Sequence, residues 1–269
     1  MMHVDVNGRV VYAYTGARSP RVGQQDVVFV HGAANDHSVW MLQSRYVAHH
    51  GRNVYAVDLP GHGRSAGPAA TSVDALAAWL LDFLAAAGIV RATLVGHSLG
   101  SLAALAAAAR APDRVAALAL LGTAVPMPVS EALLAAASAD DHVAYELING
   151  WSFSAGAKLR GNRMPGVWMT GNAMRLMERT LPGVLHADLA ACNDYAGGLA
   201  AASAVQCPVL LVQAARDIMA PPANAQALAA AMRDVRRLML PDCGHSMMTE
   251  APDEVLDALR TFLADVASG

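Results

Sequence analysis

Charged residues are scarce in this 269-residue chain: Asp, Glu, Lys and Arg make up 15% of it, and the formal net charge is −3. The sequence also lacks any run of Lys and Arg that would read as a phosphate-binding stripe, which argues against nucleic acid as a partner. Hydrophobic residues make up 55% of the chain, so it can bury a large core. The composition is therefore that of a folded domain and not of a disordered segment.

Cysteine is rare as well, with three residues at irregular spacing, Cys192, Cys207 and Cys243. An odd number without a regular pattern predicts small buried thiols in a reducing compartment and argues against a disulfide framework. The N-terminal residues lack the basic start and apolar stretch of a signal peptide. No apolar run approaches the roughly 20 residues that a membrane span needs. We therefore expect a cytoplasmic, soluble protein that does not bind membranes.

Strand and helix patterns alternate through residues 1–124. Asn7-Gly8 between alternating apolar residues predicts a hairpin, because both residues tolerate a positive φ. The elements expected after it are strands at 27–30, 53–57, 92–95 and 115–121 and helices at 39–49, 73–87 and 99–110. The later strands are continuously apolar, which is typical of a parallel sheet covered by helices on both faces.

The alternation lapses between residues 125 and 204 and then resumes to the end of the chain. Residues 125–204 are predicted to be helical or irregular, with a Gly- and Pro-containing loop at 154–170. The expected elements after it are strands at 209–213 and 235–240 and helices at 223–232 and 253–264. Because the sheet pattern returns, we predict one α/β core formed by residues 1–124 and 205–269, interrupted by a helical insertion at residues 125–204.

Gly96-His97-Ser98-Leu99-Gly100 matches the pattern Gly-x-Ser-x-Gly. The pattern is weak by itself, because Gly63-Arg64-Ser65-Ala66-Gly67 matches it too. Context separates the two. Ser98 follows a predicted strand and precedes a long predicted helix. It would therefore lie on a tight strand-to-helix turn, which is where such a motif exposes a nucleophilic serine oxygen. Ser65 has no strand before it and a proline soon after it, so we interpret it as structural.

A serine hydroxyl becomes a nucleophile when a base accepts its proton, and an acid must orient that base. The expected order along this kind of sheet is serine, acid, histidine. His245 and Asp217 both follow predicted strands, and loops at the carboxyl ends of parallel strands are where such sheets build sites. Asp217 could instead be a structural carboxylate that accepts hydrogen bonds in a turn or at a helix N-cap. Asp242 lies too close to His245 along its loop, whereas Asp188 and Asp194 fall in the insertion.

Acyl transfer also needs N–H donors for the oxygen of the tetrahedral intermediate. The backbone N–H of Leu99, at the start of the helix, is the first candidate for this oxyanion hole. The second donor should come from the loop His31-Gly32-Ala33-Ala34, where small residues let the backbone approach a substrate. Ala33 is favoured there, and Ala34 remains the alternative.

Together these segments resemble the α/β-hydrolase superfamily, and specifically its small, lid-bearing bacterial serine esterases and lactonase-like members. The resemblance covers essentially the whole chain. It implies the α/β-hydrolase fold, a mostly parallel central sheet with helices on both faces and residues 125–204 as a helical lid. The segments that carry it are His31-Gly32, Trp40, Asp58–Ser65, Gly96–Gly100, Cys207–Leu210, Asp217 and Cys243–His245. Ala215 departs from the pattern, since relatives often have glycine before the acid turn, and this weakens the placement of Asp217.

The resemblance implies an enzyme that hydrolyses a carboxylic ester, thioester or lactone without a cofactor or metal. Ser98 stands where related dehalogenases and epoxide hydrolases have aspartate, and where dienelactone hydrolases have cysteine. Residues 33–36 do not resemble the glycine-rich oxyanion loop of the enzymes that split carbon–carbon bonds. Two alternatives stay open, a ligand-binding receptor of this fold with little turnover and a cofactor-free perhydrolase side activity. The expected partner is a small-molecule ester, and the oligomeric state, a homodimer included, is left open.

The insertion holds many apolar side chains that a lid would bury against a substrate: Met127, Trp151, Phe153, Met164, Trp168, Met169, Met174, Met177 and Leu181. From these and the loops near the triad we predict that Trp168, Met169, Met219 and Met247 contact the substrate. The alternative for any single methionine is core filling. The cations of the insertion that could meet an acidic substrate are few: Lys158, Arg160, Arg163 and Arg175. Uncharged esters with short to medium apolar acyl chains are therefore expected, because flexible thioethers suit varied apolar groups.

Overall fold

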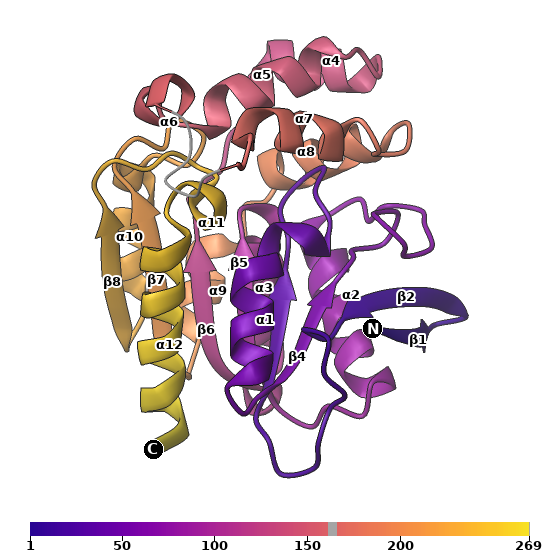
Figure 1. Cartoon of the computed structure of the whole chain (residues 1–269), viewed down its shortest axis with the longest axis vertical. Helices are drawn as coiled ribbons and strands as arrows, with labels where there is room; N and C mark the ends of the chain where they lie inside the picture. The colour runs from indigo at the N-terminus through magenta and orange to yellow at the C-terminus, as the bar shows by residue number, and fades with distance from the viewer. Residues whose placement is uncertain (161–165, 269) are drawn as a thin grey trace.

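A computed structural model of the protein describes residues 1–160 and 166–268 (Figure 1). Its centre is an eight-stranded sheet, and the strand order across it differs from the order along the chain. From edge to edge the strands are β1 (Met2–Val6), β2 (Arg9–Tyr14), β4 (Asn53–Val57), β3 (Asp26–Val30), β5 (Ala92–His97), β6 (Val115–Leu121), β7 (Val209–Ala214) and β8 (Val235–Leu240). Strand β2 pairs antiparallel with β1 and β4, and the other pairs are parallel. The predicted mostly parallel sheet is confirmed.

Helices cover both faces of the sheet, as the continuously apolar strands predicted. One face carries α2 (Val73–Ala86), α3 (Leu99–Arg110), α9 (Gly198–Ala204) and α10 (Gln226–Ala231). The other carries α1 (Met41–His49), α11 (Met247–Glu250) and α12 (Pro252–Ser268), and α1 and α12 lie in front of the sheet in Figure 1. Short 3₁₀ helices precede α1, β6 and α10, at His37–Trp40, Pro112–Arg114 and Pro222–Ala225. Each face therefore has its own apolar cluster.

Local signals explain where several of these helices begin. The side chain of Ser72 accepts a hydrogen bond from the N–H of Ala75 at 3.1 Å and so caps the start of α2. The Asn7-Gly8 turn of the predicted hairpin has φ of 55° and 78°, and it joins β1 to β2. Among the described residues, no helix combines the length and the apolar character needed to cross a bilayer.

The insertion forms a separate layer at the carboxyl ends of the parallel strands, at the top of Figure 1. Its helices are α4 (Glu131–Ser138), α5 (Val143–Ser152), α6 (Ala155–Arg160), α7 (Met169–Met177) and α8 (Val184–Asn193). Helices α4, α5, α7 and α8 share a small apolar cluster that also includes Ala34 of the sheet core. Helix α9, although it belongs to residues 125–204, packs on α3 and joins the core layer.

Helix α6 and the start of α7 fall inside the stretch 154–170 that the sequence led us to expect as a loop, and that expectation was wrong for residues 155–160 and 169–170. The start of α6 is stabilised by Ser154, whose Oγ accepts a hydrogen bond from the N–H of Ala157 at 3.1 Å. The glycine in this short helix masked the N-cap signal. Residues 161–165 of the expected loop, with Arg163 and Met164, lie outside the described residues.

Candidate active site

Ser98 occupies the sharp turn between β5 and α3, with φ 52° and ψ −122°. A positive φ is uncommon for a residue with a Cβ, and it persists only where the surroundings impose it. The glycines on either side explain how the turn fits. A Cβ on Gly96 would collide with the carbonyl group of Gly100, and one on Gly100 would collide with the carbonyl oxygens of β3 and its following residue. The turn therefore requires both glycines, and it brings Ser98 to the wall of a pocket.

Asp217 and His245 follow β7 and β8, and the structure brings them together. The Nδ1 of His245 lies 2.8 Å from Oδ2 of Asp217, and both side chains are buried. The other carboxylate oxygen, Oδ1, accepts hydrogen bonds from the N–H groups of Met219 and Ala220 at 2.9 and 2.8 Å. Burial raises the pKa of Asp217, but His245 and these donors outweigh it and hold that pKa below its usual value. The acid is thus a fixed carboxylate facing the imidazole.

His245 lines the same pocket as Ser98, so the predicted base and the predicted nucleophile face one cavity. Gly122, directly after β6, makes room for the imidazole there. A Cβ built on Gly122 would lie 3.1 Å from Cε1 of His245 and 3.2 Å from its Nδ1. A larger residue at this position would press on the ring.

His97, for which the sequence suggested no role, holds the backbone of His245. Its Nε2–H donates to the carbonyl oxygen of His245 at 2.9 Å, and the two ring centroids lie 4.7 Å apart. Burial and the neighbouring His245 lower the pKa of His97 to about 3, so its ring stays neutral. The only available signal was its place beside the serine in the glycine-rich motif.

The loop after β3 contains both residues that the sequence suggested for the second oxyanion donor, Ala33 and Ala34. Ala33 lines the pocket, whereas the N–H of Ala34 donates to Oδ2 of Asp188 at 3.0 Å and is engaged there. Of the two residues weighed for this role, Ala33 is therefore the better placed. Leu99 is the first residue of α3, where backbone N–H groups have no partner within the helix.

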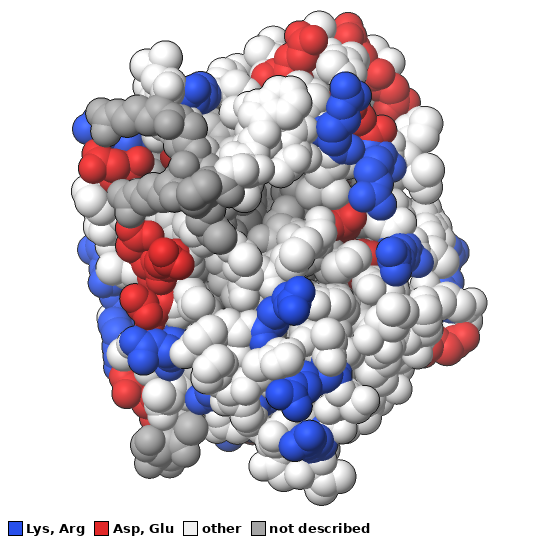
Figure 2. All heavy atoms as spheres, in the orientation of Figure 1, with Lys and Arg blue, Asp and Glu red and all other residues white. Residues whose placement is uncertain are grey.

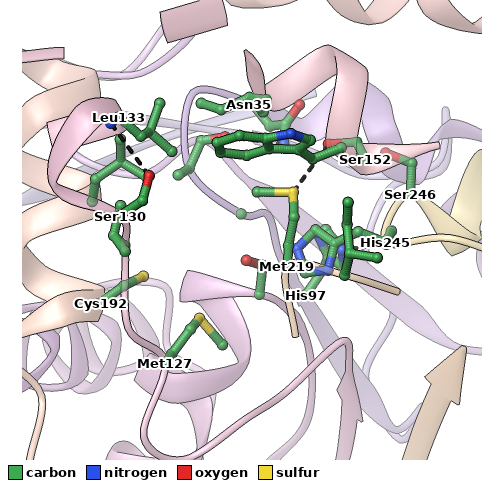
Figure 3. A pocket seen from close by; sticks show the side chains of 18 of the residues that line it. Asn35, His97, Met127, Ser130, Leu133, Ser152, Cys192, Met219, His245 and Ser246 are labelled. Atoms are coloured by element: carbon green, nitrogen blue, oxygen red, sulfur yellow. Dashed lines mark hydrogen bonds between the residues drawn. The ribbon is translucent and has the colours of Figure 1, made fainter. Parts of the chain in front are cut away.

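The pocket beside Ser98 has a volume of about 320 Å³ and reaches from the core into the insertion. The insertion contributes mainly apolar side chains and small hydroxyls to its wall: Met127, Ser130, Leu133, Trp151, Ser152 and Leu189. Figure 3 shows the thioether of Met219 between Ser152 and the ring of His245, and the Oγ of Ser152 donates to its Sδ at 3.4 Å. Met219 therefore joins the acid loop to the insertion over the site.

Of the predicted substrate contacts, Met219 is the one that lines this pocket. Trp168 is 72% exposed, and Met169 and Met247 are buried elsewhere, Met247 in the core cluster beneath α12. Met127 and Trp151, which the sequence placed only in the general apolar inventory, take their place in the wall. Periodicity shows that a helix has an apolar face, but it does not show which cavity that face lines.

No Asp, Glu, Lys or Arg is among the pocket-lining side chains of the described residues. Two of the cations considered for acid recognition point elsewhere, since Lys158 donates to the carbonyl oxygen of Gly150 and Arg175 pairs with Glu178 at 2.7 Å. Figure 2 shows blue and red side chains scattered over one face of the molecule, without a continuous stripe of either sign.

Asp36, His37 and Asp58 are the one group of potential metal ligands that cluster within the described residues. The carboxylate of Asp58 is already engaged by protein donors: Oδ1 by the N–H and Nδ1 of His37 at 2.7 Å, and Oδ2 by the N–H of Arg64 at 2.9 Å. Ser65 donates to the carbonyl oxygen of Asp58 at 2.7 Å and is buried. These contacts hold the loop after β4, which agrees with the structural interpretation of Ser65.

The fold and the strand-end loops are those of an α/β hydrolase, and the sequence comparison agrees. The sequence model of the alpha/beta hydrolase fold family matches residues 27–252, and the chain belongs to this family.

Relatives of this chain include named enzymes. It is 32% identical over 266 residues to a pimeloyl-[acyl-carrier protein] methyl ester esterase of Aromatoleum aromaticum, covering 92% of this chain and 100% of that protein. It is 30% identical to a putative carbamate hydrolase, RutD, of Klebsiella pneumoniae, covering 93% of each. Among solved structures, an enol-lactonase of Burkholderia xenovorans superposes with a TM-score of 0.84 at 22% identity over the full length of both chains. The chain is thus a hydrolase of this fold with esterase- and lactonase-like neighbours.

Proposed function

We propose that the protein is a serine hydrolase that cleaves a carboxylic ester, or a thioester or lactone, through an acyl-enzyme on Ser98. One observation carries this proposal: the elbow serine and His245 line one pocket, and the Nδ1 of His245 lies 2.8 Å from the carboxylate of Asp217. Nucleophile, base and orienting acid come from three separate strand ends in the expected order, and such a constellation is typical of acyl transfer.

In the proposed reaction, Oγ of Ser98 attacks the substrate carbonyl carbon while its proton passes to Nε2 of His245. Asp217 keeps the other ring nitrogen protonated and balances the imidazolium charge. The tetrahedral oxygen accepts hydrogen bonds from the N–H groups of Leu99 and Ala33. His245 then gives its proton to the departing alcohol, leaving the acyl group on Ser98. A water molecule, activated by the same histidine, releases the acid and restores the serine.

The pocket supports uncharged substrates of modest size. A volume of about 320 Å³ lies at the small end of ligand sites, which span about 300–1,000 Å³. A wall without acidic or basic side chains offers no partner to a substrate carboxylate, and burying an unpaired charge is costly. We therefore propose neutral esters with short to medium acyl groups, with the insertion acting as the lid that bounds the acyl site. The esterase among the relatives, named for a methyl ester, agrees with a small alcohol group.

The test compares the protein with Ser98→Ala. The unaltered protein should react with a fluorophosphonate probe and hydrolyse p-nitrophenyl butyrate. Ser98→Ala should abolish labelling and lower kcat by about 10⁴-fold or more, and adding His245→Ala should cost little further, since such residues act as a unit. Near-normal turnover by Ser98→Ala would overturn the proposal. Labelling without turnover would favour a receptor instead, and turnover only with peroxide and a carboxylic acid would favour a perhydrolase.

A second measurement addresses the substrate. A neutral ester should be a better substrate than an isostere that carries a carboxylate in its acyl chain, by about tenfold or more in kcat/KM. EDTA should leave both rates unchanged, because no proposed step uses a metal ion. A preference for the charged ester would show that cations line the acyl site.

A further inference from the structure

A buried carboxylate in the insertion reaches the oxyanion loop of the core. Asp188 lies on α8 and is 2% exposed. Its Oδ2 accepts the N–H of Ala34 at 3.0 Å and faces Nε2 of His62 at 2.8 Å. These partners lie 154 and 126 residues away along the chain. One oxygen atom therefore joins the insertion to two loops that follow β3 and β4.

The surroundings of His62 make this contact an ion pair. Its Nδ1 lies 3.0 Å from the carbonyl oxygen of Pro60, while its Nε2 faces Asp188. A carbonyl oxygen and a carboxylate both accept hydrogen bonds, so both ring nitrogens must donate and the imidazole carries a proton on each. Burial lowers the pKa of His62, but the charge of Asp188 and its hydrogen bond outweigh burial and raise that pKa overall. Both side chains are nearly inaccessible to water, so the pair is not screened.

The neighbouring His31 completes the electrostatic surroundings. Its ring lies 5.0 Å from that of His62, its Nδ1–H donates to the carbonyl oxygen of Gly32, and its Nε2 accepts the N–H of Leu59. Burial and the positive His62 lower the pKa of His31 to about 4, which keeps it neutral. The positive charge at this place therefore resides on His62, where it balances Asp188.

The residue that Asp188 holds is conformationally unusual. Ala34 has φ 53°, in the left-handed region that residues with a Cβ rarely occupy. Further hydrogen bonds tighten the same turn, from the N–H of Asn35 to the carbonyl oxygen of Gly32 at 3.3 Å and from Asn35 Nδ2 to that of Ala33 at 3.1 Å. Fixing the peptide between Ala33 and Ala34 restricts the rotation of Ala33, whose own N–H is the proposed oxyanion donor.

We propose that Asp188, charge-balanced by His62, is a positioning residue that aims the Ala33 N–H at the oxyanion. The inference rests on the proposed function, because it assigns a means of aiming one of its donors. Asp188 touches neither the substrate nor Ser98 in this role. Its effect passes through Ala34, and it couples the placement of the insertion to the rate of acyl transfer.

The expected effect is smaller than the loss of a donor. Removing one oxyanion donor lowers kcat by about 10²- to 10³-fold in known cases. A donor that is present but poorly aimed should retain part of its effect, so Asp188→Ala should lower kcat by about 10- to 100-fold. KM should stay within about threefold, because the contact acts on the transition state more than on the bound ester.

The test uses Asp188→Ala, the milder Asp188→Asn and, as a matched control at the end of the same helix, the exposed Asp194→Ala. Steady-state kinetics on p-nitrophenyl butyrate is paired with inhibition by a trifluoromethyl ketone, whose adduct with a serine places an anionic oxygen in the oxyanion hole. Asp188→Ala should weaken this inhibitor by the same factor by which it lowers kcat. Asp188→Asn keeps an oxygen acceptor but loses the charge, so its kcat and inhibitor affinity should lie between those of Asp188→Ala and the unaltered protein. Asp194→Ala should match the unaltered protein in both.

A normal kcat and normal inhibitor affinity in both Asp188 variants would overturn the inference while leaving the proposed function intact. So would a reduced kcat with unchanged inhibitor affinity, since a purely structural role would lower the amount of active protein alone. Failure of the unaltered protein to label at Ser98 would instead overturn the proposed function. If Asp188→Ala does not fold, Asp188→Asn combined with His62→Gln serves in its place. The double variant should lose less kcat than the product of the two single losses, and independent effects would contradict the pairing.

Discussion

The sheet core and the helical insertion hold the candidate site by different means. The core uses backbone and close packing: a strained serine between two glycines, an acid and a histidine at strand ends, and fully buried strands around them. The insertion has a smaller apolar cluster and reaches the core loops through a few polar contacts, made by Asp188, Ser152 and Ser154. The core therefore determines which groups meet, and the insertion refines how they are aimed. Substitutions in the two regions should therefore differ in how they affect stability and kcat.

The largest difference is expected between two glycines. A Cβ on Gly100 would overlap backbone oxygens of β3 and the residue after it, which cannot move without disturbing the sheet. Gly100→Ala should therefore cost about 3 kcal/mol or more and lower Tm by roughly 6–12 °C, or prevent folding altogether. Gly150 lies in α5, and a Cβ added there would meet no atom within 4 Å. Gly150→Ala should stabilise the protein by about 0.5–1 kcal/mol. Thermal melting of both variants decides this, and equal melting temperatures would contradict the comparison.

Asp217→Asn should break the chemistry of the core while preserving its fold. The Oδ1 position is held by two backbone N–H donors, so the asparagine oxygen must sit there and its NH₂ group must face His245. Two donors would then meet unless the ring takes the other tautomer, which puts a proton on the nitrogen needed as a base. We expect kcat to fall by about 10³- to 10⁴-fold with little change in Tm. Steady-state kinetics and melting measure both, and a kcat within tenfold of the unaltered protein would remove Asp217 from the triad.

The boundary between core and insertion should give an intermediate effect. Glu250 of α11 accepts the N–H of Gly244, next to His245, at 3.0 Å and the N–H and Oγ of Ser154 at 3.1 and 2.8 Å. Glu250→Gln leaves one acceptor oxygen for these three donors, and Ser154→Ala removes one donor from the insertion side. Each should lower kcat by about tenfold, because a buried polar group loses a partner and the His245 loop loosens.

Kinetics of these two variants should be compared with the exposed Glu131→Gln on α4, which should behave normally. Both boundary variants weaken the contact between Glu250 and Ser154, and Ser154→Ala also removes the hydrogen bond that caps α6. The double variant should therefore lose little more kcat than Ser154→Ala alone. Additive losses would show that Glu250 and Ser154 act on the site separately.

The same comparison explains what the sequence could predict. The strand-to-helix turn at Ser98 and the loops bearing Asp217 and His245 follow from local patterns, because strand ends and flanking glycines can be recognised over a few residues. Asp188 was set aside for lying in the insertion, away from strand ends, and no local spacing reveals a contact made 154 residues away. Trp168, directly before α7, is exposed and does not line the pocket. The sequence could not show this, since the apolar character of a side chain does not reveal which residues it will contact. Local chemistry was predictable, whereas contacts between layers were not.

The buried histidine that pairs with the insertion and those that contact the core alone should respond to pH in opposite directions. In the core, burial lowers the pKa of His97 to about 3 and that of His31 to about 4, below the ordinary value of 6.5. The unfolded chain then binds more protons, so these residues make the protein less stable as pH falls from 6.5 toward those values. His62, paired with Asp188, has a raised pKa. Its stabilisation is complete below 6.5 and is lost as pH rises through the raised value.

The smallest predicted effect is the pH dependence of this pair, and it is read as a difference between two proteins. His62→Gln removes the proton uptake that favours folding but keeps a side chain able to donate to Asp188. Melting temperatures of both proteins should be recorded from about pH 5 to about pH 9, so that titrations common to both cancel. The melting temperature of the unaltered protein should exceed that of His62→Gln by the largest amount below about pH 6.5. The difference between the two melting temperatures should shrink at alkaline pH. A gap that stays constant, or widens as pH rises, would mean that His62 is neutral in the folded protein and that Asp188 has no positive partner.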